Sequence, residues 1–128
     1  MHIQSIELYQ NDLNLLQQTV EQIIKDFATH GLEIKFSNLN KSPYEELMSQ
    51  LNPQIAHLLA NDQERLFALL YSIDLPEKKL KEALKKSDNN LVLELSELIL
   101  KRELQKVVLR NFFSNHSKNS SNQDKPQV

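Results

Sequence analysis

The chain has 128 residues, of which 40% are hydrophobic and 25% charged, with a formal net charge of −2 and no cysteine. This composition predicts one soluble globular domain with its own core, and it excludes a disulfide framework, a thiolate nucleophile and a zinc–thiolate site. The single glycine argues against Gly-rich phosphate loops and against an all-β fold with many tight turns. The chain also lacks an apolar run long enough to span a membrane and a signal-peptide pattern, so we expect a cytoplasmic protein without a membrane partner.

Charge is distributed unevenly along the chain. Residues 1–74 carry four basic and ten acidic side chains, a net of −6, whereas residues 75–128 carry eleven basic and seven acidic ones, a net of +4. The two halves are therefore expected to complement each other within the fold or between subunits, or the basic half to meet an anionic partner.

The clearest helix follows an ambiguous start, the segment 3–9, in which residues 5–9 alternate between apolar and polar types. Its apolar residues form one stripe about 100° wide on a helical wheel. They are Leu13, Leu16, Val20, Ile23, Ile24 and Phe27. Gly31 follows at the position where a left-handed residue commonly ends a helix.

Residues 32–36, with the sequence LEIKF, also alternate and allow two interpretations. In the first, they pair with residues 3–9 as parallel strands of a strand–helix–strand unit, which needs a third strand to make a stable sheet. In the second, they form an extended connector that places Leu32, Ile34 and Phe36 under the helices. The sequence leaves this choice open.

Proline and acidic residues mark the starts of the middle helices. Ser42, Pro43 and Glu45 predict a helix start, and Pro53 predicts an interruption after Leu51, because the residue before a proline avoids helical geometry. A further break is expected at residues 61–62, followed by a helix through residues 66–73. Asp74, with Pro76 and Glu77 after it, is expected to cap a short helix that ends near Lys86.

The segment 91–113 is expected to organise the fold. Thirteen of its 23 residues are Leu, Ile, Val or Phe, and it contains neither glycine nor proline. On a helical wheel these residues fall on two opposite sides, which is typical of a central helix or of one shared with a second copy of the chain. Residues 114–128 are polar and rich in Ser and Asn, and we expect this tail to be disordered.

These patterns predict a mainly α fold, a compact multi-helix bundle around the helix 91–113. A short N-terminal strand–helix–strand element, which would make the fold α+β, is the structural alternative. The ordered domain is expected to span residues 1–113.

Motifs for catalysis, cofactors and metals are lacking. The four histidines form no metal-binding pair, and the chain contains no nucleophile elbow, Walker loop or dinucleotide fingerprint. The sequence therefore favours a protein that is not an enzyme and that needs no cofactor or metal.

The lysine-rich segment 78–86 is the most distinctive charged feature, with five lysines in nine residues. Phosphate contact by such a patch, extended by basic residues of the helix 91–113, would suit a nucleic-acid accessory protein. The candidate contacts are Lys78, Lys79, Lys81, Lys85, Lys86, Arg102, Lys106 and Arg110. The lack of aromatic residues in the segment and the negative net charge count against this function, and a solvated lysine face is the simpler interpretation.

The preferred hypothesis is a protein-interaction module that binds itself as a homodimer, or binds another protein, through the helix 91–113. The candidate interface residues are Leu100, Leu104, Val107, Phe112 and Phe113. Phe112 and Phe113 have an alternative role of equal weight, in which they close one end of the core.

Overall fold

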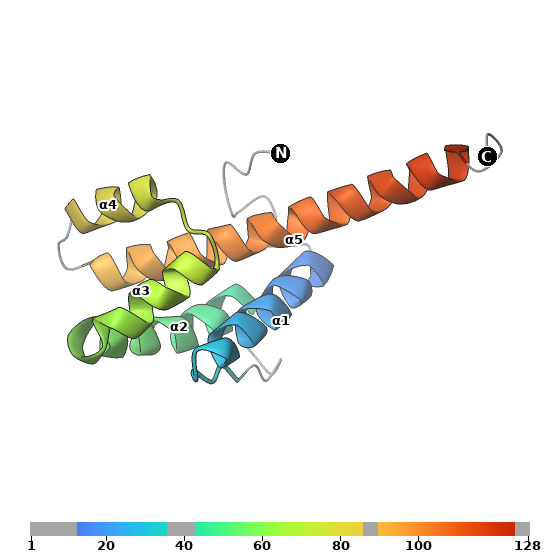
Figure 1. Ribbon diagram of the computed structural model, residues 1–128. Helices are drawn as coiled ribbons and strands as arrows, with labels where there is room; N and C mark the ends of the chain where they lie inside the picture. Colours follow the sequence, from blue (N-terminus) through green and yellow to red (C-terminus); the bar gives the residue numbers. More distant parts are fainter. Residues whose placement is uncertain (1–12, 36–42, 86–89, 125–128) are drawn as a thin grey trace.

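All regular structure in the described part of the chain is helical. The computed structural model describes residues 13–35, 43–85 and 90–124 (Figure 1). The helices are α1 (Leu13–Thr29), α2 (Pro43–Asn61), α3 (Gln63–Ser72), α4 (Glu77–Lys85) and α5 (Leu91–Asp124). This confirms the predicted mainly α fold.

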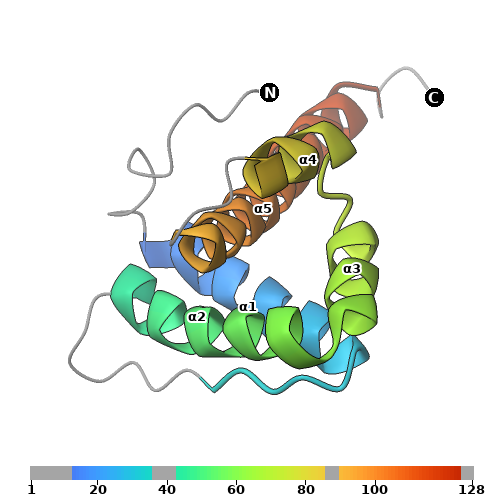
Figure 2. The same ribbon diagram turned by 90° about the vertical axis from the view of Figure 1, so that its left-hand side faces the viewer.

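Helix α5 is the element on which the others are arranged, as its two-sided apolar pattern predicted. It contacts α1, α2 and α4. Figures 1 and 2 show α4 on one side of α5 and the pair α1 and α2 on the other, with α3 connecting the two sides. The C-terminal part of α5 extends beyond α1 and leaves the bundle (Figure 1).

The core lies where α5 meets the other helices. Burial of large aliphatic side chains there supplies the main driving force for folding, at roughly 1.5–3 kcal/mol for each one. The largest fully buried side chains are Phe27, Ile23, Leu47, Leu51, Ile55, Leu58, Leu66, Leu69, Leu70, Ile73, Leu95 and Ile99. Every helix except the short α4 contributes to this set, so the described helices form one core.

The connector after α1 is not a strand. Residues 32–35 have no regular structure, and Ile34 is buried while Leu32 packs against the core. The backbone N–H of Lys35 donates to Gln50 Oε1 at 2.7 Å, and Gln54 of α2 donates to the Glu33 carbonyl. Because glutamines of α2 occupy these backbone groups, the strand interpretation of residues 32–36 is wrong at the described residues. Residues 3–9 and Phe36 lie outside the described part of the chain.

Helices α1 and α3 end in the same backbone motif. Leu32 N–H donates to the Phe27 carbonyl at 2.9 Å and Gly31 N–H to Ala28 at 3.0 Å, while Gly31 has φ +74°. This is a Schellman motif with the predicted glycine at its left-handed position.

At the end of α3, Asp74 takes the position that Gly31 has after α1. Leu75 N–H donates to the Leu70 carbonyl at 3.1 Å, Asp74 N–H donates to Tyr71 at 3.0 Å, and Asp74 has φ +59°. The prediction that Asp74 caps the next helix is therefore wrong. That residue ends α3, and α4 begins only at Glu77.

Helix α2 continues through Pro53, where an interruption was predicted. It is a single helix from Pro43 to Asn61 with Pro53 inside. Proline removes the hydrogen bond to the carbonyl of Ser49, four residues earlier, but Leu51 and Ile55 on either side are both fully buried. Packing of this continuous apolar face outweighs the local preference of Asn52 for extended geometry.

Helix α5 is longer than predicted. It was expected to end at Phe113, but the helical backbone continues to Asp124. Disorder of residues 114–128 in solution stays a prediction from composition, since these residues have few apolar side chains to bury.

Candidate functional site

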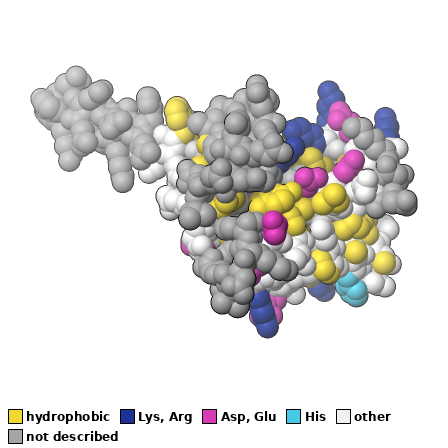
Figure 3. All heavy atoms as spheres, turned by 180° about the vertical axis from the view of Figure 1, so that it is seen from behind, with side chains coloured by type: hydrophobic (Ala, Val, Ile, Leu, Met, Phe, Trp, Pro, Cys, Tyr) yellow, Lys and Arg dark blue, Asp and Glu magenta, His cyan; other side chains and the backbone are white. Residues whose placement is uncertain are grey.

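The lysines of α4 lie on the surface of the bundle, and Figure 3 shows Lys and Arg side chains in dark blue at its upper right. Lys78, Lys79, Lys81 and Lys85 are all exposed, and Lys86 lies outside the described residues. Lys81 Nζ lies 3.4 Å from Glu77 Oε1, with both side chains more than half exposed, so this ion pair contributes less than about 1 kcal/mol. Glu77 and Glu82 line the same shallow groove as Lys78, Lys81 and Lys85, which makes this face of α4 mixed in charge.

Arg102 is partly buried and is held in place by two hydrogen bonds. Its Nε donates to the Ile73 carbonyl at 2.9 Å, and its Nη1 donates to Gln105 Oε1 at 2.9 Å. Ile73 is the C-terminal cap of α3, where a positive charge is favourable because helix carbonyls point toward it. Arg102 therefore fixes the end of α3 against α5.

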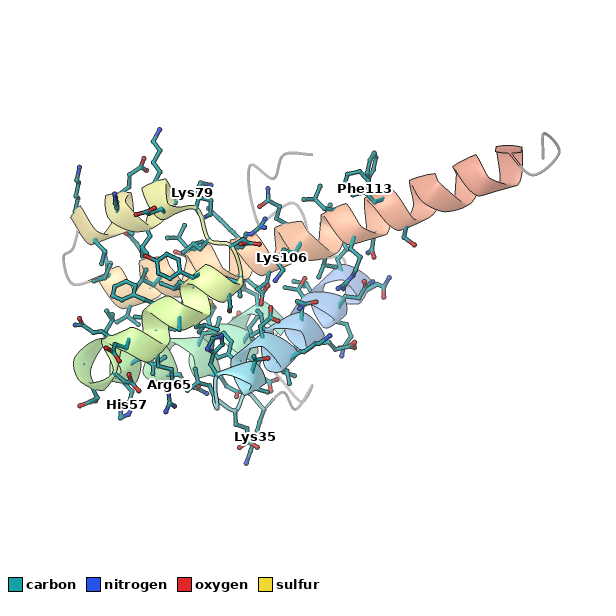
Figure 4. All side chains as sticks on the ribbon, in the orientation of Figure 1. Lys35, His57, Arg65, Lys79, Lys106 and Phe113 are labelled. Carbon is teal, nitrogen blue, oxygen red and sulfur yellow. The ribbon has the colours of Figure 1, made fainter. Side chains whose placement is uncertain are left out.

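Lys106 and Arg110 face α1 rather than α4. Lys106 Nζ lies 3.1 Å from Asp26 Oδ2, and Arg110 Nη1 donates to Gln22 Oε1 at 2.9 Å. Gln22 in turn donates to Asp26 Oδ1 at 3.0 Å, so these four side chains form one polar seam between α1 and α5. Since α1 and α4 lie on opposite sides of α5 (Figures 1 and 4), the structure does not bring Lys106 and Arg110 together with the α4 lysines.

The seam ends at Glu103, which is not among the site residues predicted from the sequence. Glu103 is fully buried, and Lys106 Nζ lies 3.0 Å from its Oε1. No hydrogen bond of acceptable geometry from the described residues reaches either carboxyl oxygen. Burial, together with the neighbouring Asp26 carboxyl, raises the pKa of Glu103 to about 8, so its neutral form predominates at pH 7.

A signal for Glu103 was present in the sequence. On the wheel that starts at Leu91, Glu103 falls at about 120°, between Ile99 and Val107. An acidic residue within an apolar arc indicates a buried carboxyl with a partner on a facing helix. What the pattern does not give is the identity of that partner, because Asp26 comes from α1, at the other end of the described chain.

A groove of about 280 Å³ runs between α4 and α5 and contains five charged side chains. These are Lys79 and Glu82 from α4, with Glu94, Glu97 and Lys101 from α5. Glu97 also accepts a hydrogen bond from Tyr44 Oη at 3.3 Å, which connects the groove to α2. Acidic and basic side chains line the groove together, and the described residues among them form no arrangement of nucleophile and base.

The predicted interface residues separate into a buried and an exposed group. Leu100, Leu104 and Val107 are almost completely buried by the chain itself. Phe112 and Phe113 are 47% and 61% exposed, and their rings pack edge to face with centroids 5.4 Å apart. Figure 4 shows Phe113 on the side of α5 that points away from α1, so Phe113 does not close the core.

The described residues include no group of three or more His, Asp or Glu side chains placed to hold a metal ion. In that same part of the chain, no helix has the length and apolarity needed to cross a membrane. Comparison with protein-family models, with curated proteins and with solved structures found no match to this chain.

Proposed function

We propose that the chain is a non-enzymatic, cytoplasmic protein-interaction module that forms a homodimer through α5 around Phe112 and Phe113. The observation that carries the proposal is the exposure of these two adjacent aromatic rings at the point where α5 leaves the bundle. Aromatic residues are enriched in the buried centres of protein interfaces, where each one removes a large apolar area from water.

The surroundings of the aromatic pair suit a second copy of the same surface. Between Lys106 and Lys118 the only charged residue is Arg110, whose guanidinium is engaged with Gln22 of α1. Two such surfaces related by a twofold axis meet with little like-charge repulsion, and each aromatic pair packs on its symmetry mate. This interface is small and predicts a dimer that dissociates in the micromolar range.

Leu100, Leu104 and Val107 are excluded from the proposed interface because they are buried within the monomer. These residues serve the core of the monomer, so a dimer that used them would require the bundle to open. The proposal therefore places the contact on Phe112 and Phe113 and leaves the rest of α5 inside its own bundle.

The mass of the protein in solution tests the proposal. We expect a dimer at high micromolar concentration by light scattering behind a sizing column, with little dependence on salt because the contact is apolar. The double variant Phe112→Ala/Phe113→Ala is expected to be monomeric with unchanged helix content. The control is Tyr71→Ala, because Tyr71 is another aromatic residue, 59% exposed, on α3.

Two results would contradict the proposal. One is a wild-type protein that stays monomeric at high micromolar concentration. The other is a dimer that persists in the Phe112→Ala/Phe113→Ala variant and dissociates only in the Tyr71→Ala variant.

A second candidate function, nucleic-acid binding through the segment 78–86, is supported by the exposure of four of its lysines. Because Arg102, Lys106 and Arg110 are engaged within the fold, such binding would rest on α4 alone, with Glu77 and Glu82 beside the lysines. We expect weak binding that disappears with added salt. Fluorescence anisotropy with labelled DNA and RNA at low salt measures this, and no change in anisotropy would remove the candidate.

A further inference from the structure

A small pocket next to the α4–α5 groove has a lining whose charged residues are all basic. It lies between the start of α4 and the middle of α5 and encloses about 70 Å³. Its polar lining consists of Lys79 from the first turn of α4 and of Lys101, Arg102 and Gln105 from α5, and the other lining residues are apolar. A space of this size exceeds the ~30 Å³ share of one water molecule and admits a compact ion with several oxygen atoms.

The two lysines that line this pocket are not held in ion pairs by the described residues. Neither Lys79 nor Lys101 makes an ion pair there, whereas Lys81 and Lys106 both do. Figure 4 shows Lys79 at the end of α4 that follows the loop from α3, beside α5. Three cations that line one cavity repel one another, and an anion placed between them relieves that repulsion.

Arg102 gives the pocket a fixed wall. Its hydrogen bonds to Ile73 and Gln105 use Nε and Nη1 and hold the guanidinium in place. In the described part of the chain Nη2 makes no hydrogen bond, so its two N–H groups are available to a ligand. A guanidinium that is already ordered loses little further entropy when it binds an oxyanion.

The carboxylates nearest to the pocket lie in the adjoining groove. Glu82, Glu94 and Glu97 line that groove together with Lys79 and Lys101, but they do not line the pocket itself. They keep the local net charge moderate when the pocket is empty. They also disfavour a long polyanion along α4 and favour a small ligand that fits among the three cations.

We propose that this pocket binds a compact oxyanion of the phosphate type, free or as the terminal group of a small phosphate monoester, through Lys79, Lys101 and Arg102. The site shares no residue with the aromatic pair of α5, so anion binding and self-association can be tested independently.

Thermal unfolding with inorganic phosphate as the probe tests the proposal. At a phosphate concentration of tenfold the dissociation constant, the melting temperature of the wild-type protein should rise by about 5 °C relative to sodium chloride of equal ionic strength. The variant Lys79→Gln/Lys101→Gln should lose this rise. The matched control Lys78→Gln/Lys85→Gln removes the same charge from the same region but leaves the pocket lining intact, and it should keep the rise. Because these four lysines are exposed, all the variants should fold.

The possible outcomes distinguish free phosphate from a phosphate monoester, and the pocket from the outer face of α4. A rise with inorganic phosphate alone assigns the site to the free ion, and a larger rise with phenyl phosphate assigns it to a monoester. No phosphate-specific rise in the wild-type protein overturns the proposal, as does an equal rise in the pocket variant. A single-stranded oligonucleotide that binds the pocket variant normally but not the Lys78→Gln/Lys85→Gln control places anion contact on the outer face of α4, and this too overturns it.

Discussion

The Nζ atom of Lys106 on α5 lies 3.1 Å from the Oδ2 atom of Asp26 on α1. This ion pair joins the two helices through residues that are 80 positions apart in the chain. Both side chains are mostly buried, at 28% and 19% exposure. The same ammonium group lies 3.0 Å from Glu103, so one cation serves two carboxyl groups that would otherwise face each other without compensation.

Replacing Lys106 should therefore destabilise the fold more than replacing an exposed lysine. We expect Lys106→Met to lower the free energy of unfolding by about 2 kcal/mol, because it leaves Asp26 without its counter-charge beside Glu103. Urea denaturation followed by circular dichroism measures the change. Lys25→Met on the exposed face of α1 is the control and should change stability by less than about 0.5 kcal/mol. Equal effects of the two substitutions would mean that the seam contributes nothing.

The raised pKa of Glu103 predicts an unusual pH dependence of the free energy of unfolding. Its pKa in the folded chain is raised to about 8, whereas the ordinary value is 4.5. Between these values the unfolded chain carries the ionised form and the folded chain the protonated one, so stability from this group is complete below pH 4.5 and is lost as the pH rises through 8. Burial opposes ionisation of Asp26, but the neighbouring Glu103, Gln22 and Lys106 side chains together hold its pKa below the ordinary value. The stabilising contribution of Asp26 is therefore lost only at acid pH.

The substitution Glu103→Gln tests this dependence, because glutamine keeps the shape and removes the titration. We expect the wild-type protein to lose more stability than the variant between pH 5 and pH 8.5, measured as the shift in urea midpoint. Parallel pH profiles for the two proteins would show that Glu103 titrates normally.

The left-handed residues that end α1 and α3 predict a pair of opposite effects. Asp74→Gly should stabilise the protein by about 1 kcal/mol, because glycine adopts φ +59° without the cost that a side chain imposes. Gly31→Ala should destabilise it by a similar amount, roughly 1 kcal/mol, for the same reason. A Cβ at Gly31 would meet no atom within 4 Å, so the expected loss is conformational and not steric. Melting temperatures of both variants measure the effects, and a stabilising Gly31→Ala would contradict this account.

Pro53 leaves α2 without one of its internal hydrogen bonds. We expect Pro53→Ala to stabilise the protein by roughly 1–2 kcal/mol, because alanine restores the donor and is the best helix former. Part of the gain is offset by the greater freedom of the unfolded chain. Thermal unfolding provides the measurement, and since Pro53 is exposed the substitution leaves no cavity. A loss of stability would indicate that the packing of α2 requires the proline.

The sequence predicted those features of the fold that depend on periodicity. The stripe of α1, Gly31 at its end and the two-sided burial of α5 follow from the spacing of apolar residues, and the structure has all three. Pro53 and Asp74 were mispredicted because both predictions relied on local conformational preference. At Pro53, packing of the apolar face of α2 outweighs the local preference for a break. Asp74 takes its conformation from the end of α3, which precedes it, and not from the start of α4.

The candidate site was less accessible to prediction. The lysines of α4 were identified, but grouping them with Arg102, Lys106 and Arg110 assumed that basic residues on neighbouring helices share a face. Whether a basic side chain of α5 faces α4, α3 or α1 depends on the rotation of that helix in the bundle. Glu103 was missed because its neighbouring carboxyl, Asp26, comes from α1, far away in the sequence, although its other partner, Lys106, is on α5 itself.

The position of α5 in the chain has a consequence for biosynthesis. Helices α1, α2 and α4 all precede their common partner, so a chain emerging from the ribosome shows their apolar faces to water until α5 follows. Such intermediates are prone to aggregate and are natural clients of chaperones. A chain that is cut before residue 91 should therefore fail to fold on its own, and supplying α5 as a separate peptide should rescue its solubility.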